Sequence, residues 1–361
     1  MIKELGDICT PKQWKTISEE MLTQEGYPVY GANGVIGFFS EYNHENSTLL
    51  VTCRGATCGS LNICVPYSYV NGNAIALDNL SDDVDIKYLK YYLQYRGFQD
   101  VITGSAQPQI VRKNIERIKV FYPEKEKQYE IVKILESVDK VIDWHKELLS
   151  IHSETIRSRF IEFFSNTDNR VKLSDVAHVS GGLTKNSKRE KLELRLPYLR
   201  VANVSFASID VTEMLDIGLT EQEKEKTLLQ YEDLLFVEGN GSPEQIGKVA
   251  IWRNEVVPCV HQNHLIKARF NQTKMLPTYA MYYFMSQEGR EQIKKTAVTT
   301  SGLFTLSVSK IADFTLPFPT METQRKFVEF ANQVESAKKA VQESLDNLEI
   351  LKKALMQKYF G

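Results

Sequence analysis

Residues 109–142 read QIVRKNIERIKVFYPEKEKQYEIVKILESVDKVI, and residues 305–341 read TLSVSKIADFTLPFPTMETQRKFVEFANQVESAKKAV. The two stretches align at a constant offset of 196 residues, which pairs Pro123 with Pro319. Self-similarity at a fixed offset is the sequence signature of a structural repeat. We therefore interpret the chain as a head-to-tail duplication in which this stretch is part of a shared frame.

Each copy continues after its proline into a long helical pattern with an apolar residue at every seventh position. Four such heptads in each helix predict coiled-coil pairing, and the natural partner of each helix is the other helix of the same chain. A helix of this length spans on the order of 55 Å. The predicted seam consists of Leu135, Ile142, Leu149 and Ile156 in the first helix and of Val334, Val341, Leu348 and Leu355 in the second, with Val138, Val141 and Leu148, and Ala331, Leu345 and Leu351, beside it.

Upstream of each helix, short apolar runs bounded by Gly, Asn and Ser indicate a compact module of strands and turns. Weaker matches between the modules drift from an offset of 168 to one of 196, so we expect their loops to differ in length. We expect strands at 48–52, 233–237, 115–122 and 311–318, and helices at 86–95 and 278–286.

The predicted fold class is α+β, with two β-rich globular modules separated by two long antiparallel helices in an intramolecular coiled coil. Two similar units joined head to tail with antiparallel helices would be related by an approximate two-fold axis. Two-fold symmetry and a rigid spacer suit a reader of two half-sites on duplex DNA. The predicted segments are a first module at 1–122, a first helical spacer at 123–170, a second module at 171–320 and a second spacer at 321–361.

The charge of the chain is poor for a DNA-binding protein acting alone. The formal net charge is −2, and residues 171–320 carry 18 Lys and Arg against 17 Asp and Glu. Phosphate neutralisation supplies most non-specific affinity, so we expect partner proteins to contribute contacts. The absence of an apolar N-terminal region and of a run of about 18 apolar residues predicts a cytoplasmic protein without a membrane span.

Catalytic signatures are weak or missing. The segment 242–248 resembles a phosphate-binding loop, but Ser242 stands where glycine is needed and Val249 where a Mg²⁺-binding hydroxyl is needed. The five cysteines form no closely spaced pair, which favours reduced thiols over a zinc site. His261 and His264 lie three residues apart, and a polar cluster on a strand, a contact with base or phosphate and a metal site remain open for them.

Polar side chains on glycine-rich turns are the informative feature of both modules. Arg and Lys pair with guanine and Asn and Gln with adenine in the major groove, although turn chemistry alone explains many such residues. The candidate DNA-binding residues are Asn33, Arg54, Gln107, Gln109, Arg112, Lys113, Gln245, Lys248, Arg253, His261, Gln262, Asn263, Thr300 and Ser301.

Along its whole length the chain resembles the specificity subunits of type I restriction-modification enzymes. The resemblance rests on PVYGANG at 28–34, GSAQPQ at 104–109, PEKEKQ at 123–128, and several motifs of the second copy. These second-copy motifs are DLLFVEGNG at 233–241, QIG at 245–247, CVHQNH at 259–264, TSGL at 300–303, and PFPTMETQ at 317–324.

The resemblance implies a non-catalytic subunit whose two target recognition domains each specify one half of a split, asymmetric double-stranded DNA site. It also implies that the helices dock two modification subunits, which carry S-adenosylmethionine and methylate adenine. Restriction subunits that use ATP and Mg²⁺ to translocate DNA can join the complex. No cofactor or metal is expected in this chain itself.

Two other functions fit parts of the sequence. A coiled-coil adaptor or structural protein would use the paired helices for protein contacts and would not bind DNA. A nuclease would use carboxylates that no motif reveals. Salt-sensitive retention on DNA and metal-dependent cleavage by the chain alone separate these alternatives.

Overall fold

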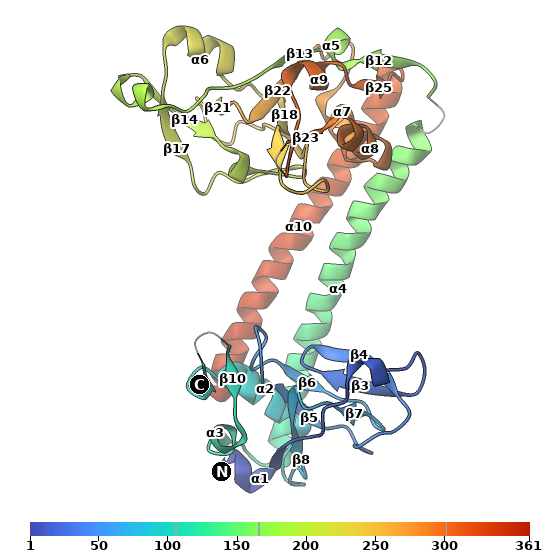
Figure 1. The fold of residues 1–361 in the computed structure, drawn as a ribbon, viewed down its shortest axis with the longest axis vertical. Helices are drawn as coiled ribbons and strands as arrows, with labels where there is room; N and C mark the ends of the chain where they lie inside the picture. The colour runs from blue at the N-terminus through green and yellow to red at the C-terminus, as the bar shows by residue number, and fades with distance from the viewer. Residues whose placement is uncertain (105–106, 165–166, 301) are drawn as a thin grey trace. The chain divides into compact units, whose positions relative to one another are not determined.

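The computed structural model describes residues 1–104, 107–164, 167–300 and 302–361 (Figure 1). The chain divides into two compact units, the first formed by residues 1–147 with 342–361 and the second by residues 148–341. These units differ from the four predicted segments, because each takes one half of each long helix together with a module. The reason is packing, since apolar residues from both helices enter the core of each module.

The first unit contains a four-stranded sheet of order β2-β8-β5-β6 and a three-stranded sheet of order β4-β3-β7, in which β3 and β7 run parallel. Two-stranded pairs join β1 to β11 and β9 to β10. The elements are β1 (Ile2–Glu4), α1 (Leu5–Ile8), β2 (Thr10–Gln13), η1 (Glu19–Met21), β3 (Tyr27–Gly31), β4 (Gly34–Phe39), β5 (Leu49–Thr52), β6 (Leu61–Ile63), β7 (Tyr69–Val70), β8 (Ala74–Asp78), α2 (Ile86–Arg96), β9 (Ile102–Thr103), β10 (Gln109–Ile110), α3 (Arg112–Ile115), β11 (Lys119–Phe121) and the start of α4 (Lys125–Phe164).

The second unit repeats this topology, with sheets of order β13-β22-β18-β20 and β17-β14-β21 and a parallel pair between β14 and β21. The elements are β12 (Arg170–Lys172), α5 (Leu173–Val176), β13 (Ala177–Ser180), η2 (Ser187–Lys191), β14 (Arg195–Leu199), η3 (Val201–Asn203), β15 (Val204–Ser205), β16 (Ser208–Ile209), β17 (Leu215–Gly218), α6 (Glu221–Thr227), β18 (Leu234–Val237), β19 (Gly239–Asn240), β20 (Val249–Ile251), β21 (Val260–His261), β22 (Leu265–Phe270), α7 (Pro277–Met285), α8 (Gln287–Thr296), β23 (Val298–Thr300), β24 (Leu303–Thr305), α9 (Val308–Ala312), β25 (Thr315–Pro317) and α10 (Met321–Phe360).

The repeat extends to individual hydrogen bonds around a buried glutamine at the start of each long helix. Gln128 donates to the carbonyls of Asp83 and Pro123 and accepts from the N–H of Asp85, at 2.8 Å in each case. Gln324 makes the same three bonds with Lys274, Pro319 and Leu276. An unpaired buried amide is costly, so each glutamine fixes the helix to its module. The predicted duplication and fold class are confirmed.

Aromatic side chains bring the end of one long helix against the module of each unit. In the first unit, Phe360 of α10 lies 5.4 Å from the ring of Tyr88. In the second, Phe164 of α4 lies 4.6 Å from the ring of Tyr279. The helix segments within each unit run antiparallel, since the start of one helix meets the end of the other.

The predicted seam lies inward within each unit. Leu135, Ile142 and Ile156 are buried, and the other five seam residues are half-buried. Leu148 and Leu351, expected beside the seam, are instead exposed. The strands expected at 115–122 and 311–318 also begin later, because Ile115 and Ile311 belong to the short helices α3 and α9 and the strands start at Lys119 and Thr315. Within the described part of the chain, no helix is both long enough and apolar enough to span a bilayer.

Candidate nucleic-acid interface

Three polar turns meet at one end of the first module, and we call the residues Asn33, Arg54, Gln107 and Gln109 the first rim. The β3–β4 turn is held by the Thr52 hydroxyl, which donates to the Ala32 carbonyl. The loop after β5 is held to β10, because Ile110 donates to the Cys53 carbonyl at 2.9 Å and Gly55 donates to that of Pro108 at 3.1 Å. All four rim side chains are exposed.

Arg54 is the charged residue of the first rim. Arg112 pairs with Glu116 at 2.6 Å, but among residues with described positions no carboxylate lies within ion-pair distance of Arg54. Gly55 follows with a φ of 86°, a backbone conformation that favours glycine. A side chain added there would meet nothing within 4 Å, so the loop borders open space. Arg54 is therefore free to reach an external acceptor.

The second module places an equivalent set of turns at the same end of its sheet, and we call the residues Glu238, Asn240, Gln245, Gln262, Asn263 and His264 the second rim. Leu306 donates to the Glu238 carbonyl at 2.8 Å, which matches the bond between Ile110 and Cys53 in the first module. The backbone N–H of Glu238 in turn donates to the His264 carbonyl at 2.9 Å. In the first module the backbone N–H of Cys53 donates to the Asn73 carbonyl at 3.1 Å. The backbone frames agree, and the side chains differ.

A close contact between a histidine and a carboxylate is the most distinctive feature of the second rim. The Nδ1 atom of His264 lies 2.8 Å from Oε2 of Glu238, and the histidine side chain is 56% exposed. The sequence-based candidates from this segment were His261, Gln262 and Asn263; His264 was considered only together with His261, and Glu238 and Asn240 were not candidates.

Two of the predicted DNA-binding residues do not present their side chains at the rims. His261 is 0% exposed, and its Nδ1 atom lies 2.8 Å from the Leu265 carbonyl. Burial lowers the pKa of His261 to about 4, so the ring is neutral near pH 7. Arg253 follows β20, which runs away from the rim because it is antiparallel to β18, and its guanidinium binds Glu232 at 2.9 Å and Thr278 at 3.1 Å.

The remaining candidate DNA-binding residues lie at different places in the two modules. Lys113 is exposed on α3, next to Arg112. Lys248 is half-buried at the rim end of β20, with its Nζ atom 6.0 Å from the ring centre of Phe206. Thr300 ends strand β23 of the hairpin that borders the second rim. Ser301 lies outside the described residues.

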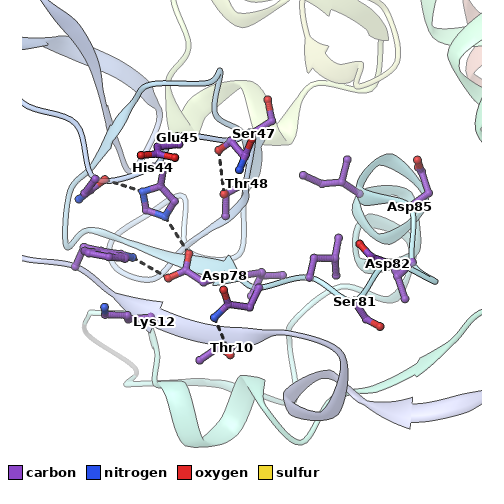
Figure 2. A pocket seen from close by; sticks show the side chains of 18 of the residues that line it. Thr10, Lys12, His44, Glu45, Ser47, Thr48, Asp78, Ser81, Asp82 and Asp85 are labelled. Atoms are coloured by element: carbon purple, nitrogen blue, oxygen red, sulfur yellow. Dashed lines mark hydrogen bonds and ion pairs between the residues drawn. The ribbon is translucent and has the colours of Figure 1, made fainter.

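A cleft in the first unit holds a buried His44, shown in Figure 2 with Asp78 below it. The Nε2 atom of His44 lies 2.9 Å from Oδ1 of Asp78, and Nδ1 lies 2.6 Å from Oδ1 of Asn43. Both ring nitrogens therefore have partners other than the nearby Ser47 and Thr48. The arrangement ties the loop at 43–48 to β8 and does not form a nucleophile–base pair.

No three His, Cys, Asp or Glu side chains come together as a metal site anywhere in the described ranges. The five cysteines are free thiols. Burial raises the pKa of Cys9 and of Cys259 to about 12, so these two are poor nucleophiles at neutral pH.

A repeated frame that carries two differing polar rims defines an internally duplicated protein. Residues 1–151 and 167–349 match the family described as type I restriction modification DNA specificity domain, and the chain belongs to this family.

Two similar proteins are named as specificity subunits of type I restriction enzymes. The EcoprrI specificity subunit of Escherichia coli is 25% identical over 161 residues, which cover 43% of this chain and 40% of that protein. The EcoKI specificity subunit of Escherichia coli K12 is 27% identical over 184 residues, or 48% of this chain and 39% of that one. The alignments thus span less than half the length of these relatives.

The fold is shared with solved structures over the whole chain. The S subunit of a type I restriction-modification system from M. genitalium superposes with a TM-score of 0.64 at 16% identity, covering 100% of this chain and 96% of that one. A chain from a structure on complex assembly and conformational transition of the type I system gives a TM-score of 0.60 at 12% identity, with 100% and 97% covered.

Proposed function

We propose that this chain is the DNA-specificity subunit of a type I restriction-modification complex and that each module reads one half of a bipartite, asymmetric site. The observation that carries the proposal is the matched position of the two rims. They lie on the same backbone frame, held by equivalent hydrogen bonds to the hairpin that follows. Because Cys53 and Arg54 stand where the second module has Glu238 and Gly239, the two half-sites differ in sequence.

The rims carry the groups that recognise base edges. Arginine pairs bidentately with guanine, asparagine and glutamine with adenine, and a carboxylate accepts from cytosine N4. The near-neutral charge of the chain supplies little attraction for phosphate, so the proposal assigns most backbone contacts to partner subunits.

Exposed apolar side chains on the long helices support protein docking there. In the first unit, Trp144 and Ile350 are each 64% exposed. In the second, Ile151 and Ile161 are 52% and 55% exposed. Exposed apolar surface of this kind marks contacts with other proteins. We assign these surfaces to modification subunits, which co-purification with an adenine methyltransferase tests.

The proposed complex works in the cytoplasm, and the chemistry belongs to its other subunits. Two modification subunits carry S-adenosylmethionine, and restriction subunits carry ATP and Mg²⁺. The specificity subunit holds no cofactor and performs no catalytic step in this proposal. A coiled-coil adaptor without DNA binding is the alternative that the next experiment excludes or supports.

Replacing Arg54 with alanine is expected to weaken DNA binding by the complex with its modification subunits by about 1–3 kcal/mol, the usual loss for one bidentate base contact. The loss should be confined to DNA that carries the correct first half-site, because Arg54 belongs to the first rim. Fluorescence anisotropy at several salt concentrations measures it.

Lys133 on α4 gives a charge-matched control, since Lys133→Ala removes one positive charge from an exposed helical position. Equal losses for the two variants would show that Arg54 contributes charge alone. For the wild-type complex, DNA binding that does not weaken as the salt concentration rises would count against DNA recognition altogether.

A further inference from the structure

The second module contains two segments longer than their counterparts in the first, and these segments contact each other. The loop between β5 and β6 spans residues 53–60, whereas the loop between β18 and β20 spans residues 238–248 and includes β19. After α7 the chain also forms helix α8 (Gln287–Thr296) before reaching β23. The longer loop carries Asn240 and Gln245 of the second rim, so whatever holds its conformation affects the rim.

Arg290 of α8 binds three backbone carbonyls of this loop. Its Nη2 atom donates to the carbonyls of Ile246 at 2.7 Å and Glu244 at 3.2 Å, and Nη1 donates to that of Gly247 at 3.0 Å. The guanidinium is half-buried, and its Cζ atom lies 5.0 Å from the ring centre of Phe206. One cation thus gathers three carbonyl dipoles that point to the same place.

Other contacts also hold loop 238–248 against α8. The Nζ atom of Lys294, one helical turn further along α8, lies 2.6 Å from Oε1 of Glu244 and 2.7 Å from Oε2. Gly247 has a φ of 61°, and a side chain at this position would come within 2.6 Å of Cγ2 of Ile293. The loop therefore has one close-packed conformation against α8.

The planar guanidinium is suited to this task in a way that an ammonium group is not. Arginine presents five N–H donors in a fixed fork, whereas lysine offers a compact charge on a flexible stem. Without the fork, three partly buried carbonyls would have to find water or move apart. The expected consequence is a loop with several conformations.

We propose that Arg290 is a positioning residue, which holds loop 238–248 in the conformation that reads DNA without touching DNA itself. The inference rests on the proposed function and deepens it, because the sequence preference at the second half-site then depends on α8 as well as on the rim.

The binding test uses the complex with its modification subunits and three variants, Arg290→Met, Arg290→Lys and Lys295→Met. Lys295 is 81% exposed on the same helix and serves as the matched control. Each complex is offered duplexes with one base pair changed in the first or in the second half-site. Arg290→Met should lose roughly tenfold discrimination at the second half-site, the usual penalty for one mismatched pair, and none at the first.

The lysine variant separates position from charge. Arg290→Lys keeps the charge and should still lose discrimination, because it cannot bind the three carbonyls together. Full rescue by lysine would show that charge is what matters and would overturn the proposal. Equal losses at both half-sites, or a loss with Lys295→Met, would also overturn it.

Hydrogen exchange on the chain without DNA tests the loop itself. The N–H of Ile246 donates to Ser242 at 3.1 Å and that of Gly247 to Val237 at 3.2 Å, so both amides should exchange faster in Arg290→Met and at the normal rate in Lys295→Met. Unchanged exchange in Arg290→Met would overturn the positioning role.

The two arms distinguish the failure of the proposed function from that of the inference. A wild-type complex without preference at either half-site contradicts DNA reading, while the exchange rates still decide whether Arg290 orders the loop. If Arg290→Met does not fold, the DNA-binding test and the hydrogen-exchange test are both made with Arg290→Lys.

Discussion

Exchanging residues 171–320 for the corresponding module of another type I specificity subunit is expected to change one half of the methylated DNA sequence and to leave the other unchanged. The physical reason is the independence of the two rims, each of which is built from turns of its own module. The seam residues and the buried glutamines Gln128 and Gln324 that join helix to module lie on the shared frame. Sequencing of methylated adenines in a host with the hybrid and its methyltransferase measures the result.

The reciprocal hybrid, in which residues 1–122 are exchanged, is the matched control and should change the opposite half. A change in both halves from either exchange would show that the modules do not read DNA independently. Unaltered methylation in both hybrids would place the specificity outside these modules.

Replacing Phe164 with alanine is expected to destabilise the second unit by about 3–5 kcal/mol, the usual cost of removing a buried phenylalanine. Phe164 is 4% exposed and contacts Tyr279 at 4.6 Å and Phe327 at 5.3 Å between ring centres. The loss combines the transfer free energy of the deleted ring with the cost of an unfilled cavity at the centre of an aromatic cluster. Calorimetry should show a lower melting temperature for the second unit.

Phe360 occupies the equivalent place in the first unit and is a natural comparison. It is half-buried, and its ring centre lies 5.4 Å from that of Tyr88 and 5.9 Å from that of Tyr92. Phe360→Ala should therefore cost less than Phe164→Ala, since less apolar surface leaves the core. A larger loss for Phe360→Ala would contradict the packing described for the two helix ends.

The frame could be predicted from the sequence because its signals are local and repeated. Pro123 and Pro319 precede the two helices, and the seven-residue apolar period runs through both. The short helices α3 and α9 were missed because their apolar residues Ile115 and Ile311 lead directly into strands. Helix α8 was missed because it is largely polar, although Ser286 caps it through a bond from the Gly289 N–H at 3.3 Å.

The site residues were harder to predict because their roles depend on contacts between distant parts of the chain. Arg253 has no evident partner close by in the sequence, but in the fold its guanidinium donates hydrogen bonds to Glu232 and Thr278. His261 lies in a strand of two residues, where alternation cannot decide which side faces the core. Arg54, Gln107 and Gln109 are exposed at the first rim, although Gln109 belongs to strand β10 and not to a turn, and their role on DNA stays a prediction.

The most direct test of DNA reading by two modules is single-molecule sequencing of genomic DNA from a host that carries this chain with its methyltransferase. The account predicts methylated adenines within one bipartite sequence, whose two specific parts differ and are separated by unspecified bases. Methylation at one continuous sequence, or a stable complex with the methyltransferase that leaves the genome unmethylated, would contradict it.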